Sequence, residues 1–320
     1  MSHVTGAVLA LLLAGCGPPA APASAPAAAP APAAAGFPRD VAAPDGATLR
    51  LLAPPQRVVG GSSGVGDILC ELLPPERLAG LPDQMRAYSS HRADADPYLQ
   101  RPCFHVFAAE PVLALRPDLV VADHWQPAET AARLREAGVP VLVIDKLERL
   151  DDVRAALRLL GRAVGEESRA EAVLADVDAR IARLAAAPGA RRGLRVLAYT
   201  NGGTGGWAAG GGTSADEWIT LAGLSNAVAA REGHVRFAYE ELLALDPDVL
   251  VVPGPDNPDE RGGTESLVRS EPLLAGLRAR RRGLIVTLSS WLFSTNSQNI
   301  VTAAEQLASR LDALLAEAPP

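Results

Sequence analysis

A serine between glycines is the first feature of the sequence that could do chemistry. Residues 60–64 read Gly-Gly-Ser-Ser-Gly and satisfy the G-x-S-x-G pattern of a nucleophile elbow around Ser62. A serine hydrolase also needs a histidine on a late loop with a carboxylate partner, and His234 is the only histidine in the second half of the chain. We therefore prefer a Ser/Gly turn that opens a helix, and keep a serine hydrolase that uses Ser62 as an alternative.

A second glycine-rich segment lacks the residue that phosphate chemistry needs. Residues 206–213 follow the outline of a P-loop, but Gly212 stands where the lysine belongs. Without that positive charge the segment would not stabilise the phosphates of a nucleotide. We expect no nucleotide hydrolysis and no catalytic residue in this chain. Thr213 with Asp216 instead predicts the N-cap of a following helix, whose N-terminus could receive an anion.

The histidines and cysteines are not spaced like the ligands of a metal site. None of the five histidines has a second histidine four residues away, and the three cysteines form no C-x-x-C pair. We therefore expect no metal site and no resident cofactor, and keep a zinc- or manganese-binding protein as a second alternative.

Charge and length restrict the class further. The chain has 320 residues, with 30 Lys and Arg against 37 Asp and Glu, and no long basic run. A net charge of −7 without such a run excludes nucleic acid as the expected partner. The length is typical of about two compact units.

Apolar strands alternate with helical segments through the body of the chain. The predicted strands cover residues 57–60, 119–122, 141–144, 194–200, 249–252 and 284–288, and the predicted helices cover 65–73, 128–137, 214–222 and 297–315. Continuous apolar strands that alternate with helices indicate parallel sheets covered on both faces. The predicted fold class is therefore α/β.

An internal repeat divides this body into two lobes. Residues 107–121 recur as residues 237–251 without a gap, each copy reading as a short helix that stops before a proline and leads into a buried strand. Two α/β lobes follow, which we place at residues 55–150 and 189–320. Residues 151–188 between them have helical spacing, and the portion after Gly165 alone would extend ~33 Å. Gly161 and Gly165 are the positions at which this stretch can break. We expect one stiff helix to join the lobes.

The first residues predict export. Residues 4–15 form an apolar run that is too short to cross a hydrocarbon core of ~30 Å, so residues 1–16 are expected to be a signal peptide. The run ends in Leu-Ala-Gly-Cys, which resembles the lipobox of bacterial lipoproteins, in which Cys16 would carry the lipid. Residues 17–54 are expected to be an Ala/Pro-rich tether. Export permits a disulfide between Cys70 and Cys103, which the sequence leaves open.

These features together resemble a family. A lipobox, an Ala/Pro tether, two lobes joined by a long helix and twin Glu-x-x-Leu-Ala-Leu-x-Pro-Asp segments are similar to the substrate-binding proteins of iron-chelate, heme and cobalamin ABC importers. The resemblance covers residues 57–315. It implies two Rossmann-like lobes with mainly parallel sheets, and a monomer that is lipid-anchored in the periplasm or on the outer face of the cell membrane. It also implies that the chain passes an iron-siderophore, heme or cobalamin to a permease dimer with its ATPase subunits.

The strand ends predict which residues meet the ligand. Ligands of open α/β sheets bind beyond the carboxyl ends of the strands, and aromatic side chains there suit a large planar ligand. The expected ligand-binding residues are Ser62, Ser63, Tyr88, His91, His124, Trp125, Asn201, Trp207, Trp291 and Phe293. A sharper hypothesis makes His91, Tyr88 or His124 an axial ligand of heme iron.

Two glutamates hold equivalent positions in the repeat. Glu110 and Glu240 each begin one of the twin segments. In the resembled family one glutamate on each lobe docks into an arginine pocket of the permease, and these two residues match those positions. The alternative is local, because an acidic side chain near a helix N-terminus is favoured by the helix dipole.

Overall fold

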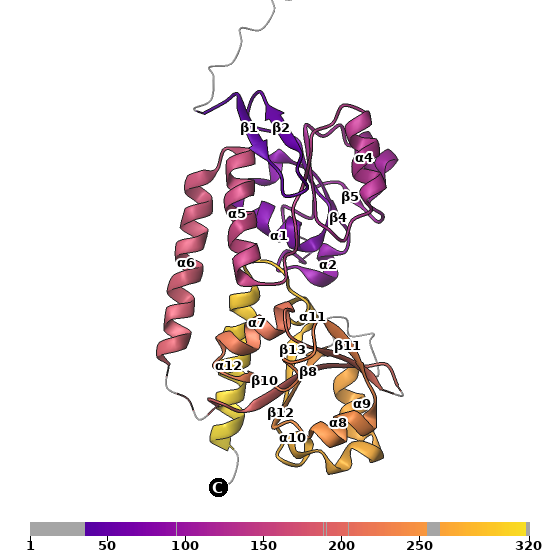
Figure 1. Ribbon diagram of the computed structural model, residues 1–320, viewed down its shortest axis with the longest axis vertical. Helices are drawn as coiled ribbons and strands as arrows, with labels where there is room; N and C mark the ends of the chain where they lie inside the picture. The colour runs from indigo at the N-terminus through magenta and orange to yellow at the C-terminus, as the bar shows by residue number, and fades with distance from the viewer. Residues whose placement is uncertain are drawn as a thin grey trace, which may run out of the picture. The chain divides into compact units, whose positions relative to one another are not determined.

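The computed structural model describes residues 36–93, 95–187, 189, 191–203, 205–254 and 263–317. The predicted signal peptide, Cys16 and most of the predicted tether lie outside these residues. Within them two large β-sheets form, one in each half of the chain, together with a separate two-stranded hairpin (Figure 1). The helices in this part of the chain are all too short or too polar to cross a bilayer.

The first sheet is entirely parallel and runs in the order β5-β4-β3-β6-β7. Its strands are β3 (Val58–Gly60), β4 (Leu78–Pro82), β5 (Cys103–Phe104), β6 (Leu119–Ala122) and β7 (Val141–Val143). Every residue of β3, β4 and β6 is buried, as expected for strands covered on both faces.

The second sheet is parallel in its centre and antiparallel at one edge. Its strands are β8 (Arg195–Asn201), β9 (Gly206–Ala209), β10 (Ser225–Asn226), β11 (His234–Phe237), β12 (Val249–Gly254) and β13 (Ile285–Ser289). Strands β10, β8, β12 and β13 pair in parallel, whereas β8-β9 and β9-β11 pair antiparallel. The prediction of two mainly parallel α/β lobes is confirmed. The antiparallel edge was not predicted, because its Gly-Trp-Ala-Ala strand reads as part of a glycine-rich loop.

Apart from the two helices between the lobes, which are described below, the helices cover these sheets and connect their strands. They are α1 (Ser63–Leu72), α2 (Met85–Tyr88), α3 (Ala109–Ala114), α4 (Ala128–Glu136), α7 (Ser214–Leu221), α8 (Tyr239–Leu245), α9 (Thr264–Ser270), α10 (Arg278–Arg281), α11 (Ser290–Phe293) and α12 (Ile300–Glu317), with 3-10 turns η1 (Pro75–Arg77) and η2 (Pro272–Gly276). The predicted helices over 65–73, 128–137, 214–222 and 297–315 correspond to α1, α4, α7 and α12.

The segment between the lobes forms two helices, α5 and α6, and the second of them joins the lobes. Helix α5 (Leu150–Val164) ends at Gly165, whose φ of 78° is left-handed and whose N–H bonds to the Gly161 carbonyl. Helix α6 (Glu167–Ala186) then runs beside α5 (Figure 1). The helical stretch is thus interrupted at Gly165, one of the two glycines at which we expected a break, because a glycine at this position allows the chain to reverse. The prediction that the portion after Gly165 forms a long helix is confirmed.

Helix α6 contacts both lobes. Its Arg169 Nε donates to the carbonyl of Glu71 at 2.8 Å, at the end of α1 in lobe one. Its Arg180 Nε donates to a Glu305 carboxylate oxygen at 3.0 Å, and another Arg180 nitrogen donates to Thr302 Oγ1 at 2.8 Å, both on α12 in lobe two. The helix therefore connects the lobes along their side.

The end of the predicted tether is folded. Strands β1 (Arg39–Ala42) and β2 (Thr48–Leu51) pair antiparallel, and Val41, Leu49 and Leu51 are buried in the core. Figure 1 shows this hairpin next to α5, and Arg39 donates to the Arg162 carbonyl of that helix at 2.6 Å. The tether prediction over 17–54 is therefore wrong for residues 36–54, because alternating apolar residues outweigh the Ala/Pro composition there.

Candidate ligand-binding site

A pocket lies between the lobes at the carboxyl ends of both sheets. Its volume is about 290 Å³, and its lining residues from lobe one are Trp125, which follows β6, and Glu148, which follows β7. Lobe two supplies the rest of the lining: Ala198, Thr200, Trp207, Ala209, Thr213, Ser214, Ala215, His234, Phe293, Ser294 and Asn296. Strand ends of an open α/β sheet are where ligands are expected. We call this space the cleft pocket.

Exposed aromatic side chains from both lobes line the cleft pocket. Trp125 is 66% exposed in lobe one, and Trp207 is 51% exposed in lobe two. Phe293 is held more firmly, because its ring lies 6.1 Å from the ring of the buried Trp218. Large exposed indoles leave apolar surface unburied, and such surface favours a flat, partly apolar ligand. The prediction that Trp125, Trp207 and Phe293 face one cleft is consistent with this lining.

Ser62 organises lobe one instead of lining the pocket. Its hydroxyl caps α1 by accepting from the Val65 N–H at 3.3 Å, and it donates to the Asp123 carboxylate. The other Asp123 oxygen accepts from the Trp125 N–H at 3.0 Å. This chain of hydrogen bonds joins the first glycine-rich turn to the loop that carries His124 and Trp125. The hydroxyl partner of Ser62 is thus a carboxylate and not a histidine.

Several expected ligand residues lie outside the cleft pocket. His91 Nδ1 is 3.0 Å from an Asp96 oxygen, and its ring lies edge-on to Tyr98 at 4.7 Å. Asn201 Nδ2 donates to Tyr239 Oη at 3.0 Å, so its amide orders the end of β8. The residues that do not line the pocket are Ser62, Ser63, Tyr88, His91, His124, Asn201 and Trp291.

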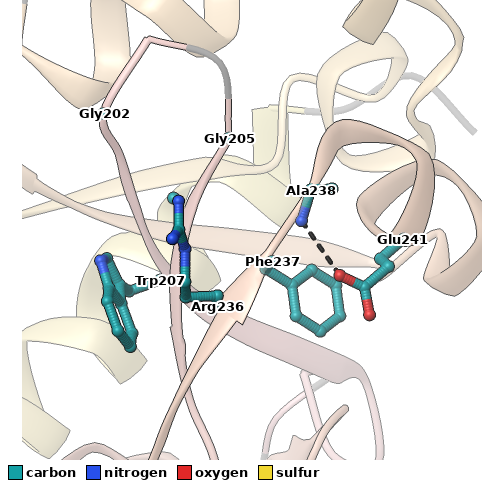
Figure 2. Close-up of a pocket in the computed structure, with 8 residues that line it drawn as sticks. Gly202, Gly205, Trp207, Arg236, Phe237, Ala238 and Glu241 are labelled. Atoms are coloured by element: carbon teal, nitrogen blue, oxygen red, sulfur yellow. Dashed lines mark hydrogen bonds between the residues drawn. The ribbon is translucent and has the colours of Figure 1, made fainter.

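A second pocket lies at the β9-β11 edge and shares Trp207 with the cleft pocket. Its volume is about 380 Å³ (Figure 2). Figure 2 shows Arg236 beside Trp207, with the guanidinium 6.0 Å from the centre of the indole ring. Glu241 accepts from the Ala238 N–H at 3.1 Å, and this bond together with Arg231 holds the pKa of that carboxyl below its usual value. Arg236 could pair with an anionic group of a ligand that reaches this side.

Some lining residues were not predicted, although the sequence carried signals for them. Glu148 follows the predicted strand over 141–144, so the strand-end rule applied there would have found it. Asn296 belongs to a Ser/Thr/Asn-rich stretch after β13. Thr213 was predicted as the N-cap of a helix whose N-terminus could receive an anion, and the cap is confirmed, because its Oγ1 accepts from the Asp216 N–H at 3.2 Å.

Clusters of metal-binding side chains do not occur among the described residues: no three His, Cys, Asp or Glu side chains come together there. The two cysteines of the lobes are both free thiols, with Cys70 buried and Cys103 exposed. This structure therefore has no disulfide between Cys70 and Cys103, a pairing that the sequence left open.

The two candidate docking glutamates are placed alike. Glu110 lies in the first turn of α3 and Glu240 in the first turn of α8, and both are exposed. Neither side chain forms a hydrogen bond or ion pair with another residue in the described part of the chain. Each is thus available to a partner molecule.

Comparison with known proteins identifies the family. The periplasmic binding protein family matches residues 102–291, which is more than half of the chain. The cobalamin-binding protein of Halobacterium salinarum is 31% identical over 145 residues, which are 44% of this chain, so the chain spans only 39% of that relative's length. The vitamin B12-binding protein of Pectobacterium carotovorum is 24% identical over 74% of this chain and 83% of the relative.

A solved structure agrees with this assignment. The periplasmic heme-binding protein of Roseiflexus sp. RS-1 superimposes with a TM-score of 0.68 at 27% identity, covering 81% of this chain and 98% of that protein. The shared architecture extends over both lobes. With two α/β lobes, a pocket between them and a family match over more than half of its residues, the chain belongs to the periplasmic binding protein family.

Proposed function

We propose that this chain is the extracytoplasmic substrate-binding component of an ABC importer, and that it captures an iron-siderophore, heme or cobalamin and delivers it to the permease. The observation that carries the proposal is the cleft pocket, which is lined by an exposed tryptophan from each lobe. Binding requires no catalytic group. The cleft needs only apolar and polar surface of the right shape.

The lining favours a large planar cargo. Trp125, Trp207 and Phe293 offer flat surfaces for stacking, and the relatives are named for cobalamin, vitamin B12 and heme. For heme, the axial-ligand hypothesis shifts from His91, Tyr88 and His124 to His234, which is the histidine in the pocket lining.

Export and anchoring complete the proposal. The family is periplasmic, which supports an extracytoplasmic location, and the lipobox-like sequence supports a lipid anchor on Cys16. The partner is a permease dimer with ATPase subunits, because the P-loop-like segment of this chain lacks its lysine. Glu110 and Glu240 are the proposed docking residues, one on each lobe.

The two alternatives have less support. Ser62 donates to Asp123 and caps α1, which explains the glycine-rich turn without a nucleophile. For a free metal ion, the pocket lining offers one histidine, His234, and one carboxylate, Glu148. Zinc sites in proteins use three or four such ligands.

The test is the identity of the bound molecule. The protein would be purified without an affinity tag, and its absorption spectrum and the mass of any copurified compound would be recorded. Titration with cyanocobalamin, hemin, a ferric siderophore and zinc would follow. We expect one of the first three to bind. Binding of zinc alone would favour a free-metal protein, and ester hydrolysis lost in Ser62→Ala would favour the hydrolase.

A further inference from the structure

A buried carboxylate connects lobe one to lobe two through hydrogen bonds, next to the cleft pocket. Asp67 lies on α1 and is 2% exposed. One of its oxygens accepts from Ser89 Oγ in lobe one. The other accepts from Ser297 Oγ at 3.1 Å and from Asn299 Nδ2 at 3.2 Å, both in lobe two. Gln298 Nε2 donates to the Asp67 backbone carbonyl at 3.2 Å, so three consecutive residues before α12 bond to one residue of α1.

The same helix contacts this stretch a second time through a glycine. A Cβ atom at Gly64 would lie 2.3 Å from Asn296 Oδ1 and 3.0 Å from the Asn296 carbonyl oxygen. The backbone of α1 therefore lies directly against Asn296, and any larger residue at this position would displace it. Thr295 and Ser297 on either side of Asn296 are both buried.

The stretch held in this way also lines the cleft pocket. Residues 293–299, which we call the cleft segment, contribute Phe293, Ser294 and Asn296 to the lining. We infer that Asp67 is a positioning residue, which acts from lobe one to hold the cleft segment of lobe two in the conformation that binds ligand. The inference deepens the proposed function and rests on it where ligand affinity is concerned.

An ionised carboxylate suits these partners better than any neutral group. Ser89, Ser297 and Asn299 all donate to it, and an ionised carboxylate only accepts. A proton on the second oxygen would face the Asn299 amide nitrogen, which cannot accept. A proton on this oxygen would therefore remove the Asn299 bond. A proton on the other oxygen, which faces the Ser89 hydroxyl, would remove the charge that strengthens the Ser297 and Asn299 bonds, so protonation at either oxygen weakens the contact with lobe two.

This geometry makes the contact sensitive to pH. Burial raises the pKa of Asp67 to about 6, against the lowering effect of its hydrogen bonds. The titratable groups nearby are His91, which is bonded to Asp96, and Cys70 one turn further along α1. The cleft segment itself contains no titratable side chain. Ligand affinity is therefore expected to fall as the pH drops through about 6.

The experiment compares Asp67→Asn with Asp83→Asn in the full protein. Asp83 is a carboxylate of lobe one that pairs with His105 at 2.8 Å, away from the cleft pocket, so its variant removes one charge without touching the cleft segment. Hydrogen exchange of the backbone amides in residues 293–299 would be measured without ligand. Affinity for cyanocobalamin and for hemin would be measured from pH 5 to pH 8.

We expect Asp67→Asn to speed exchange in the cleft segment by about tenfold, the effect of one lost hydrogen bond to a charged group. Its affinity should be lower at neutral pH, and the change near pH 6 should disappear. Asp83→Asn should match the wild type in both measurements. Ser297→Ala removes one bond from the lobe-two side, and it should speed exchange in the same segment even if Asp67→Asn does not fold.

The inference is overturned if Asp67→Asn and Ser297→Ala leave exchange in residues 293–299 at the wild-type rate. It is also overturned if Asp67→Asn keeps the wild-type affinity and pH profile. If neither probe binds the wild type at any pH, the proposed cargo is wrong, while the exchange rates still decide the role of Asp67.

Discussion

Arg116 and Asp246 lie 130 positions apart and adopt the same unusual backbone conformation. Their φ angles are 49° and 41°, and among the residues that the structure describes these are the two non-glycine residues with positive φ. Each follows the short helix of its lobe and precedes a proline. A residue before proline is disfavoured in the helical region, so the helix cannot continue and the chain turns in the left-handed region instead.

The aspartate after each proline completes the equivalence. Asp118 accepts from the Arg57 N–H at 2.8 Å at the start of β3, and Asp248 accepts from the Arg195 N–H at 3.0 Å at the start of β8. In each lobe the aspartate of the Pro-Asp pair thus forms a hydrogen bond that joins the start of the strand after the short helix to the start of β3 or β8. The sequence repeat is a structural repeat.

Replacing Arg116 by glycine should stabilise the protein. A non-glycine residue in the left-handed region costs about 1 kcal/mol, and glycine removes this cost at the price of a more flexible unfolded chain. We expect the free energy of unfolding to rise by up to about 1 kcal/mol in Arg116→Gly, measured by urea unfolding. The matched control is Arg133→Gly in the middle of α4, which should destabilise by about 1 kcal/mol. Equal losses in both variants would contradict the prediction.

Removing either exposed indole of the cleft pocket should weaken binding. Trp125→Ala and Trp207→Ala each remove a large surface that stacks on a planar ligand, so we expect the Kd for the identified cargo to rise about tenfold or more. Isothermal titration calorimetry measures this. Leu52→Ala is the control, since Leu52 is 76% exposed but does not line the pocket. Wild-type affinity in both tryptophan variants would place the ligand elsewhere.

Charge reversal at the docking glutamates should block transport without changing binding. In Glu110→Arg with Glu240→Arg, each lobe presents a positive charge where the permease is proposed to present arginine. We expect cargo uptake by cells to be abolished while ligand affinity stays unchanged. Glu136→Arg reverses an exposed carboxylate on α4 and should leave uptake intact. Uptake at the wild-type rate in the double variant would disprove docking through these residues.

The two lobe thiols should react at very different rates. Cys103 is exposed, whereas Cys70 is buried and its burial strongly raises the pKa of its thiol. Because the thiolate is the reactive species, iodoacetamide should label Cys103 in the native protein and Cys70 only after unfolding. Peptide mass spectrometry locates the label. Labelling of neither thiol before reduction would indicate a disulfide between them.

The stability of the protein should depend on pH through Asp67. Because burial raises the pKa of this carboxyl from 3.8 to about 6, the folded state binds its proton more tightly than the unfolded state does. The stabilisation that comes from this tighter proton binding is fully present below about pH 4 and is lost as the pH rises through about 6. The free energy of unfolding of the wild type should therefore fall, relative to that of Asp67→Asn, by up to about 3 kcal/mol as the pH rises from 4 to 7. Urea unfolding of both proteins across this range measures the difference, and parallel curves would contradict the prediction.

Local patterns were sufficient for most of the fold. The predicted strand over 119–122 has the bounds of β6, because a continuous apolar run in a buried parallel strand is visible without its neighbours. The β1-β2 hairpin was missed because its short alternating pattern stands in an Ala/Pro-rich region. A break at Gly161 or Gly165 was expected, but helical spacing continues on both sides of these glycines, so the sequence did not show that the chain reverses at Gly165.

The candidate site was less predictable from sequence. The strand-end rule identifies loops, but it does not say which way a side chain points or what partner it finds. His91 stands on an expected loop and is held by Asp96, whereas Asn296 lines the pocket although only the polar composition of its stretch marks it. Trp125 and Trp207 were found because a large aromatic residue on a strand-end loop has few polar partners to hold it elsewhere.

The sequence by itself determined the two-lobe α/β architecture, the equivalence of Glu110 with Glu240 and the absence of a P-loop lysine. These features depend on periodicity, repetition and residue type, which can be read along the chain without knowing which segments pack together. The tertiary structure alone decided which residues form the cleft pocket and that Asp67 bonds to Ser297 and Asn299. Those contacts join residues more than 200 positions apart, and they exist only after both lobes have folded and packed together.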